Sequence, residues 1–388
     1  MQLASYALDI LVNGKPLPLE SMPVQSILLC SSKYQRVPVG ELVISDPSGV
    51  AATVATFTDG TPVVIALGRT IQTQVQYAMR IFKIQKVQGA SGTNYRIILY
   101  ADAYLYWRGT ANIPLTSTAA DAIQSIASTC GLQVYTEKTS DYMTWLPLRS
   151  TYSAWAESIS RAAYLDNGSG FAFGLRLDGM LVLRNVGGYT YTDAAIPTFV
   201  GGYAAADLQQ GKIPLRSFKH GVISGYKNLM GGYHAQLQTQ TVMSATSTTS
   251  VTTVSKVRAT QQLHMDTTVK GELVNAPIVN QSFIDCGNTH DHYLQAIYQN
   301  SRIDQVFSSR LTLLTDVQSQ YDLLDRVKVD IYDMPVSGTT PELDRNLSGN
   351  YHIIGKSVYA DVAGTYAEKF ITVTDGHNAD PGSARSDV

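Results

Sequence analysis

Hydrophobic positions change their period along the chain, and these changes divide it into blocks. Up to about residue 112, apolar and polar residues nearly alternate in short runs separated by Gly, Pro and Asp. A period of two predicts strands, and many short strands without helices predict a β-sandwich or small barrel. The predicted strands are Ala4–Val12, Val24–Cys30, Gly40–Ile44, Pro62–Leu67, Gln74–Lys86 and Tyr95–Leu105.

Between residues 113 and 197 the period becomes helical. Thr116, Ser117 and Thr118 offer N-cap hydroxyls for a helix that runs to Cys130 and stops at Gly131. A short strand follows, and Ser150 and Thr151 then open a second helix with an apolar face. That face consists of Tyr152, Trp155, Ile159, Ala162 and Ala163. Alternating apolar residues on both sides of Asp178-Gly179 predict a closing hairpin.

A second β block follows a Gly/Ala-rich linker, and a different pattern interrupts it. Gln236–Gln262 is rich in Thr, Ser, Gln and Val, which favours an extended ribbon or arm, although a mobile loop would have the same composition. Asn288–Asp304 predicts a helix capped by Asn288 or Thr289, and strands return from Val306. No repeat of fixed spacing relates the two β blocks.

These patterns predict an α+β, mainly β fold, in which two barrel-like antiparallel β domains flank an α/β module and carry an inserted extended arm. The predicted bounds are 1–112 for the first β domain, 113–197 for the module, 198–235 with 306–375 for the second β domain, 236–305 for the arm and helix, and 376–388 for a flexible tail.

Composition favours a subunit of an assembly. Charged residues make up 15% of the 388 residues, the net charge is −2, and there are 23 tyrosines. Ordinary soluble domains carry about 25% charged residues, whereas interface cores are poor in charge and rich in Tyr. The alternative is a Ser/Thr-rich soluble β protein whose surface has little charge. The near-zero net charge argues against specific nucleic-acid binding.

Three cysteines without paired spacing, Cys30, Cys130 and Cys286, favour folding in a reducing cytoplasm. The first residues alternate like a strand and meet Asn13-Gly14, a hairpin signal, rather than forming a signal peptide. No apolar run approaches the roughly 20 residues of a membrane span. The sequence therefore predicts a soluble protein without an integral membrane segment.

One cluster has metal-ligand residue types. Cys286, His290 and His292 lie beside Asp285 and Asp291. On a helix, residues two apart diverge, and helical metal pairs use spacings of three or four. Capping and solvated polar residues at a helix start are the favoured interpretation, and no metal or other cofactor is predicted.

A second cluster has the residue types of acid/base catalysis. Asp322, Asp325 and Asp330, with Asp333 beyond them, flank a turn that looks exposed, where carboxylates are usually solvated. Hydrolysis of a glycoside would need two carboxyls held about 5–10 Å apart in a cleft, which spacing in the sequence does not predict. We therefore predict no catalytic residue.

A third cluster is basic. Lys212, Arg216, Lys219, His220 and Lys227 alternate with Phe218 and Tyr226. This spacing suits ordinary strand faces better than a nucleic-acid site, and the glycine pairs of the chain lack a phosphate-loop context.

The order of elements resembles that of the baseplate hub proteins of contractile-tailed bacteriophages, the late-control-protein and type VI spike-base family. The resemblance covers most of the chain in order. It rests on Thr118–Leu132, Thr151–Tyr164 with Trp155, Phe171–Leu183, Asn300–Ile331, Tyr351–Tyr359 and Tyr366–Thr374. The family commonly has a Pro-Gly turn where this chain has Asp322-Leu323-Leu324-Asp325.

The resemblance implies a structural virion protein rather than an enzyme. It implies two related barrel domains, a homotrimer that adapts the sixfold tail tube to the threefold central spike, and contacts with spike, tube or distal tube, other baseplate and tape-measure proteins. It implies localisation in the tail baseplate after assembly in the host cytoplasm, within a contractile injection system. Two alternatives remain: a tail-associated cell-wall or metal-dependent hydrolase, and a receptor-binding β protein.

Overall fold

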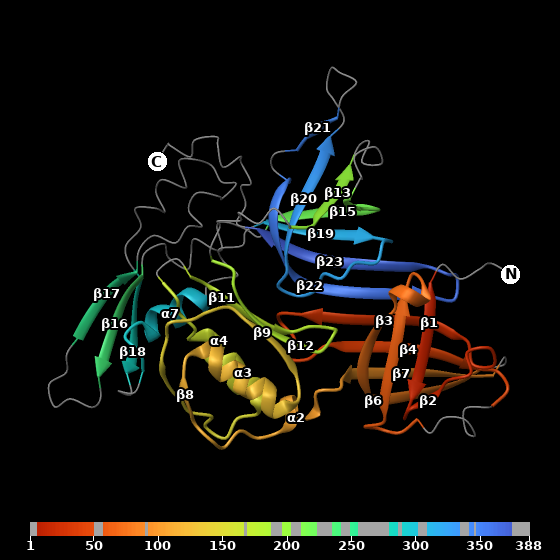
Figure 1. Ribbon diagram of the computed structural model, residues 1–388, viewed down its shortest axis with the longest axis horizontal. Coiled ribbons are helices and arrows are strands. Elements are labelled where there is room, and N and C mark those ends of the chain that lie inside the picture. Colours follow the sequence, from red (N-terminus) through yellow and green to blue (C-terminus); the bar gives the residue numbers. More distant parts are fainter. Residues whose placement is uncertain are drawn as a thin grey trace.

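The computed structural model is mainly β (Figure 1). It describes residues 6–49, 57–89, 92–166, 169–187, 196–202, 211–222, 235–241, 249–254, 279–285, 289–301, 309–333, 341–344 and 347–374. The mainly β fold class predicted from the pattern is confirmed. No helix in this part of the chain is long and apolar enough to cross a membrane.

The first β block is an antiparallel sheet in the order β2-β1-β5-β6-β7-β4-β3. Its strands are β1 (Ala7–Val12), β2 (Lys15–Pro16), β3 (Val24–Ser32), β4 (Val39–Asp46), β5 (Pro62–Gly68), β6 (Val75–Gly89) and β7 (Gly92–Ala101). Burial alternates along β4 as its sequence predicts, because one face of the sheet covers the core and the other does not. A short 3-10 helix, η1 (Ile71–Thr73), connects β5 to β6.

The last predicted strand of this block ends earlier than expected. We predicted a strand to Leu105, but β7 ends at Ala101 and helix α2 (Tyr104–Arg108) follows. Asp102 at this end forms an ion pair with Arg80, with 2.5 Å between Nε and Oδ1. Aromatic residues suit strands and helices alike, so the sequence pattern did not mark the change, which buries Tyr106 in the core.

The α/β module has the predicted order. Helix α3 (Ala119–Cys130) begins after Thr118, whose hydroxyl accepts from the Asp121 N–H, and it ends at Gly131 with φ of +69°. Helix α4 (Tyr152–Arg161) begins after Thr151. Strands β11 (Phe171–Leu175) and β12 (Met180–Asn185) form the hairpin, and β9 (Gln133–Thr136) pairs parallel to β12. Strands β8 (Leu115–Ser117) and β10 (Met143–Trp145) form a separate pair.

The second β block repeats the strand order of the first. Its order is β14-β13-β20-β22-β23-β19-β15, and each strand takes the place of its counterpart along the chain, with β21 added. The strands are β13 (Thr198–Gly202), β14 (Ile213–Pro214), β15 (Ser217–Val222), β19 (Ser309–Thr315), β20 (Arg326–Asp333), β21 (Glu342–Leu343), β22 (Gly349–Asp361) and β23 (Tyr366–Thr374). Unlike the antiparallel β1, β13 pairs parallel with both of its neighbours.

The two blocks join edge to edge. One edge of β22 pairs with β20 from Gly349 to His352 and with β3 of the first block from Gly355 to Asp361. Its other edge pairs with β23 from His352 to Ala360. The blocks therefore share one continuous sheet, in which the described strands do not close a barrel (Figure 1).

The predicted arm contains the expected ribbon. Strands β16 (Ala235–Thr241) and β17 (Thr249–Val254) pair antiparallel, and β18 (Val279–Asp285), which we did not predict, pairs parallel with β16. Helix α7 (Tyr293–Ser301) lies within the predicted helical range. The predicted cap residue Asn288, the rest of the predicted arm and the predicted tail lie outside the described residues.

Candidate functional site

Among the described residues, a densely connected polar site is the joint where the module meets both β blocks. Its centre is the loop from Tyr321 to Asp325, between β19 and β20. The Asp322 carboxylate accepts from the Ser31 hydroxyl of β3 at 3.0 Å and from the Leu177 N–H of the module hairpin at 3.1 Å. One buried side chain thus contacts all three parts of the fold.

Two leucines anchor the same loop. Leu323 and Leu324 are fully buried and pack with Ala172 and Val182 of the hairpin. Leu323 lies so close to Gly174 that a Cβ there would be 2.4 Å from its Cδ2. Leu324 has a φ of +67°, a left-handed conformation that is uncommon for any residue except glycine. The tertiary contacts therefore hold the loop in a conformation that its residues do not prefer.

An ion-pair network surrounds this loop. Asp325 pairs with Arg176 and Arg184 of the hairpin, the latter at 3.2 Å. Glu137 pairs with Arg184 at 3.5 Å and with Arg326 of β20 at 3.4 Å. Largely desolvated pairs interact more strongly than surface pairs, and removing one partner leaves an uncompensated charge. The network therefore fixes the hairpin against the second block.

A second buried ion pair lies in the second block. Lys356 and Glu368 are 3.6 Å apart, and both side chains are almost completely buried. The Lys356 ammonium also donates to the carbonyls of Ser319 and Tyr321, and Glu368 accepts from the Tyr366 hydroxyl at 2.7 Å. Burial, together with the nearby Glu368, raises the pKa of Tyr366.

Two buried groups of the joint titrate abnormally. Burial, together with the nearby cationic Arg326, Arg184 and Lys33, lowers the pKa of His352 to about 3. Burial raises the pKa of Asp322, although nearby Lys356 opposes this shift. Both shifts follow from the cost of a charge without solvent.

The predicted exposure of the aspartate cluster is wrong at three positions. Asp322 and Asp330 are buried, Asp325 is partly buried in ion pairs, and only Asp333 is exposed. Asp330 pairs with Lys212 and with Lys328, each at 3.2 Å. Strands distant in the sequence cover this turn, which local pattern does not reveal. The carboxylates of Asp322, Asp325 and Asp330 therefore accept hydrogen bonds or form ion pairs within the fold.

The histidine cluster caps a helix. His290 Nε2 lies 3.1 Å from the Ala162 carbonyl at the end of α4, and its Nδ1 accepts from the His292 N–H at 3.2 Å. The His292 ring stacks on Tyr164 with centroids 4.4 Å apart. Burial lowers the pKa of His290. Cys286 lies outside the described residues, and these show no group of three metal-ligating side chains.

Sequence reasoning missed Asn300 on α7. Its amide donates to the carbonyls of Ser160, Arg161 and Ala163 at 2.8–3.2 Å, and its oxygen accepts from the Phe171 N–H at 2.8 Å. The last carbonyls of a helix lack intrahelical partners, so Asn300 supplies donors to the end of α4 and ties it to β11.

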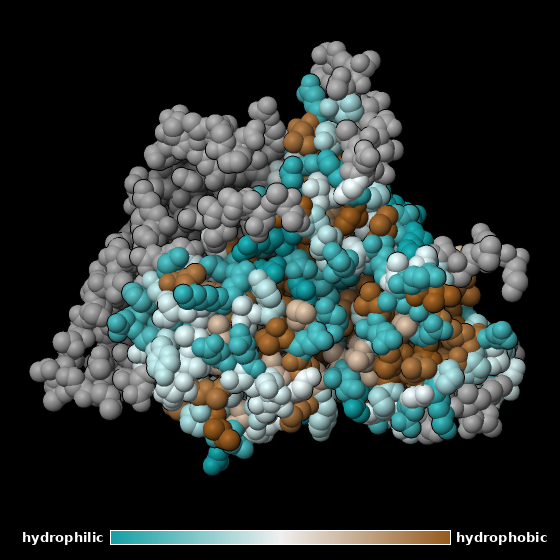
Figure 2. Space-filling view, in the orientation of Figure 1, coloured by the Kyte–Doolittle hydropathy of each residue, from teal (hydrophilic) through white to brown (hydrophobic). Residues whose placement is uncertain are grey.

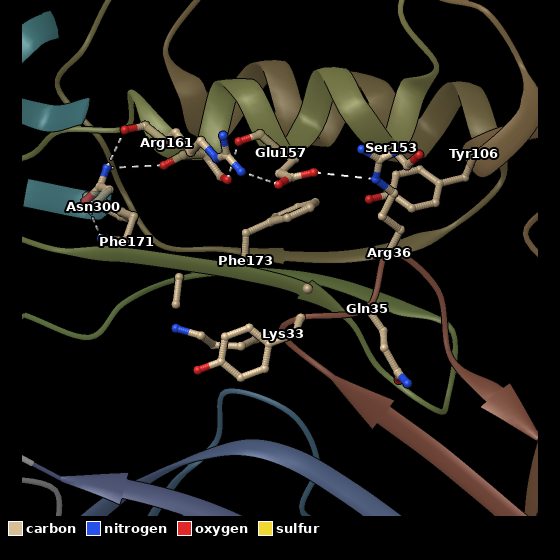
Figure 3. Close-up of a pocket in the computed structure, with 14 residues that line it drawn as sticks. Lys33, Gln35, Arg36, Tyr106, Ser153, Glu157, Arg161, Phe171, Phe173 and Asn300 are labelled. Carbon is tan, nitrogen blue, oxygen red and sulfur yellow. Dashed lines mark hydrogen bonds and ion pairs between the residues drawn. The ribbon is translucent and has the colours of Figure 1, made fainter. Parts of the chain in front are cut away.

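A groove of about 360 Å³ opens beside Asn300, between α4, β11 and the turn after β3 (Figure 3). Phe173 points toward α4 within it. Glu157 pairs with Arg161 at 2.6 Å and with Arg36 of the turn at 3.6 Å. These exposed pairs contribute little to stability, and with Lys33 they give the groove more positive than negative side chains.

The residues of the basic run lie in different surroundings. Lys212 forms an ion pair with Asp330, whereas Lys219 and His220 lie on β15, which pairs with β19 along one edge. Lys227 and Tyr226 lie outside the described residues. One feature of the sequence could have indicated the buried charges that we did not predict. Arg176, Arg184 and Glu368 lie within or beside apolar strand runs of a chain with few charges.

Comparison with solved structures identifies the fold. The tail protein from Neisseria meningitidis MC58 is 12% identical, with a TM-score of 0.60 over 96% of this chain and 98% of that chain. The 43 kDa tail protein of prophage MuSo2 from Shewanella oneidensis is 9% identical, with a TM-score of 0.58 over 96% of this chain and 99% of that chain. No protein-family model and no curated protein matches the sequence.

The chain therefore has the fold of phage tail proteins. At the level of the fold, this confirms the resemblance to baseplate hubs that the order of elements indicated.

Proposed function

We propose that this chain is a structural virion protein, a homotrimeric baseplate hub that connects the tail tube to the central spike. The observation that carries the proposal is the fold shared with two tail proteins over nearly the whole length of each chain. The partners we propose are the spike, the tube or distal tube protein, and other baseplate and tape-measure proteins. The hub would assemble in the host cytoplasm and reside in the baseplate of a contractile injection system.

The repeated strand order supports a role in symmetry adaptation. Each chain carries two blocks with the same order of seven strands. Three copies would present six similar barrel-like units to a sixfold tube, while the trimer keeps threefold symmetry toward a spike. We propose that residues 1–112 and residues 198–235 with 306–375 are these units, and that residues 113–197 form the module between them.

The surface suits a subunit with neighbours. Apolar side chains gather over the first block and at the lower end of the module in the view of Figure 2. Exposed aliphatic side chains on the module include Ile113 at 76%, Leu146 at 56% and Leu148 at 84%. Contiguous exposed apolar groups commonly mark interaction sites.

The interactions of the candidate residues support a non-enzymatic role. Asp322 and Asp325 form hydrogen bonds and ion pairs within the joint, and His290 contacts the Ala162 carbonyl at the end of α4. These side chains stabilise contacts between strands, loops and helices, as a structural protein that transmits force would need.

Light scattering after size-exclusion chromatography, combined with co-purification against the tube and spike proteins of the same tail, tests the proposal. We expect a mass three times that of the chain and a complex with at least one of the two partners. A monomer at all concentrations that binds neither protein would contradict it. Cell-wall clearing or a stoichiometric metal would favour the hydrolase instead.

A further inference from the structure

Strands β6 and β15 of the large sheet each have an open edge among the described residues. Strand β5 covers β6 only from Val75 to Arg80, although β6 continues to Gly89. Beyond the bulge after Ile81 the side chains are largely exposed, with Val87 at 59%. Strand β15 pairs with β19 on one side, and no described strand pairs with its other side. Open edges are templates for pairing with another chain.

The first of these edges has an occupied counterpart in the second block. Arg80 is the last residue of β6 paired with β5, and a bulge follows between Ile81 and Lys83. His352 is the last residue of β22 paired with β20, and a bulge follows between Ile353 and Gly355. The next seven residues of β22 pair with β3. The corresponding seven residues of β6 are its open edge.

The second open edge belongs to β15, which is the counterpart in the second block of β3, the strand that pairs with β22. Strand β15 takes the place in the second block that β3 takes in the first, at the end of the same strand order. The registers agree across the intervening strands. Cys30 lies opposite Val39 and, at the corresponding place, Gly221 lies opposite Arg310. Val39 in turn pairs with Tyr100, and Arg310 with Val373.

We propose that β6 of one copy pairs antiparallel with β15 of a second copy, in the register that β22 and β3 use within one chain. In that register Val87 lies opposite Lys219, as Tyr359 lies opposite Leu28. Gln85 then faces Gly221, as Ser357 faces Cys30. The inference rests on the proposed homotrimer and names the strands that form it.

Such a contact is head-to-tail, because each copy supplies a β6 edge on one side and a β15 edge on the other. The β22–β3 pairing joins the two blocks of one chain in the same way. Alternating strand pairings within and between copies would therefore arrange the blocks in a ring. Figure 1 shows β6 and β15 in different blocks, as this arrangement requires.

The new contact is more polar than the one within the chain. Val358 and Leu29 are fully buried partners in the β22–β3 pairing. At the corresponding positions β6 and β15 place Lys86 and His220. Backbone hydrogen bonds therefore carry most of the contact, and the lysines on both edges keep the separate chain from pairing with unrelated strands.

Disulfide trapping tests the register. In the double variant Val87→Cys with Lys219→Cys, the two cysteines lie directly opposite, and Cα atoms of antiparallel partners are about 4.5–5.5 Å apart, within disulfide range. We expect covalent dimers and trimers on a non-reducing gel, which disappear on reduction. The matched control, Gln88→Cys with Lys219→Cys, places its side chains on opposite faces and should give at most a tenth of that product.

The outcomes separate this inference from the proposed function. A wild-type trimer with no more product from the Val87 pair than from the Gln88 pair or either single variant overturns the strand pairing and leaves the hub intact. A monomer without product overturns both. Covalent ladders beyond the trimer overturn the closed ring.

Discussion

Ser31 donates its hydroxyl to the carboxylate of Asp322, with 3.0 Å between the two oxygens, and both residues are buried although 291 positions separate them in the chain. This hydrogen bond links an edge strand of the first block to the loop before β20. The joint around it makes the module and the two blocks a single unit, which the proposed role of connecting a tube to a spike would require.

Replacing Asp322 with Ala should lower the free energy of unfolding by about 3 kcal/mol, because the Ser31 hydroxyl and the Leu177 N–H then remain buried without an acceptor. Urea denaturation followed by tryptophan fluorescence measures the change. Asp333→Ala is the matched control, since Asp333 is exposed in the same cluster, and it should stay within about 0.5 kcal/mol of wild type. Equal effects of the two variants would show that the joint is not needed for stability.

Gly174→Ala should destabilise the protein by about 1–3 kcal/mol, because the new Cβ would meet Leu323 Cδ2 at 2.4 Å. Leu323→Ala alone should cost about 2–5 kcal/mol through the cavity that it leaves. The double variant should lose less than the sum, since the smaller side chain makes room for the new methyl group. A double-mutant cycle in urea measures this coupling, and strict additivity would argue against the close contact.

Acid should weaken the fold through His352. Its folded pKa of about 3 lies below the unfolded value near 6.5, so the stability that it contributes is present above pH 6.5 and is lost as the pH falls toward 3. The loss should reach about 3 kcal/mol at pH 4. Asp322 acts in the opposite direction, because its pKa is raised and the contribution of its protonated form grows as the pH falls.

The variant His352→Gln isolates the histidine from the other titrating groups. Unfolding free energies of wild type and variant, measured by urea denaturation from pH 7.5 to pH 4, should converge as the pH falls. A constant difference over that range would show that His352 does not control the acid response.

Replacing Asn300 with Ala should loosen the contact of α7 with the module. The carbonyls at the end of α4 and the Phe171 N–H lose their partner, so amide exchange at Phe171 should accelerate at least tenfold. Hydrogen-exchange mass spectrometry measures this. Gln124→Ala, which removes an exposed amide bonded to Thr136, should leave that peptide unchanged. Unchanged exchange in the Asn300 variant would mean that other contacts hold the helix end.

Local signals were sufficient where neighbouring residues decide the conformation. Thr118, Thr151 and Gly131 marked helix ends correctly, because caps are bonds within a few residues. The Asp178-Gly179 turn was equally clear, since Gly179 has a φ of +83°. The α2 helix and the third strand of the arm were missed, because each depends on packing that a period of two or 3.6 does not encode.

In the candidate sites too, features that depend on tertiary contacts could not be predicted from local sequence. Asp322 looked like a solvated turn residue and is buried, since β3 and the module hairpin cover it. The contact of Asn300 with α4, about 140 positions away, could not be predicted from spacing.

The sequence by itself determined the mainly β class, the α/β module with its caps and turn, and the low charge that favours an assembly. Alternation, capping and turn formation depend on residues close along the chain, which is why they can be read from it. Only the tertiary structure decided that the two blocks share one strand order, that β3 and β22 join them, and that buried charges close the joint. Strand pairing and desolvation depend on which distant segments meet, and the folded chain alone brings those segments together.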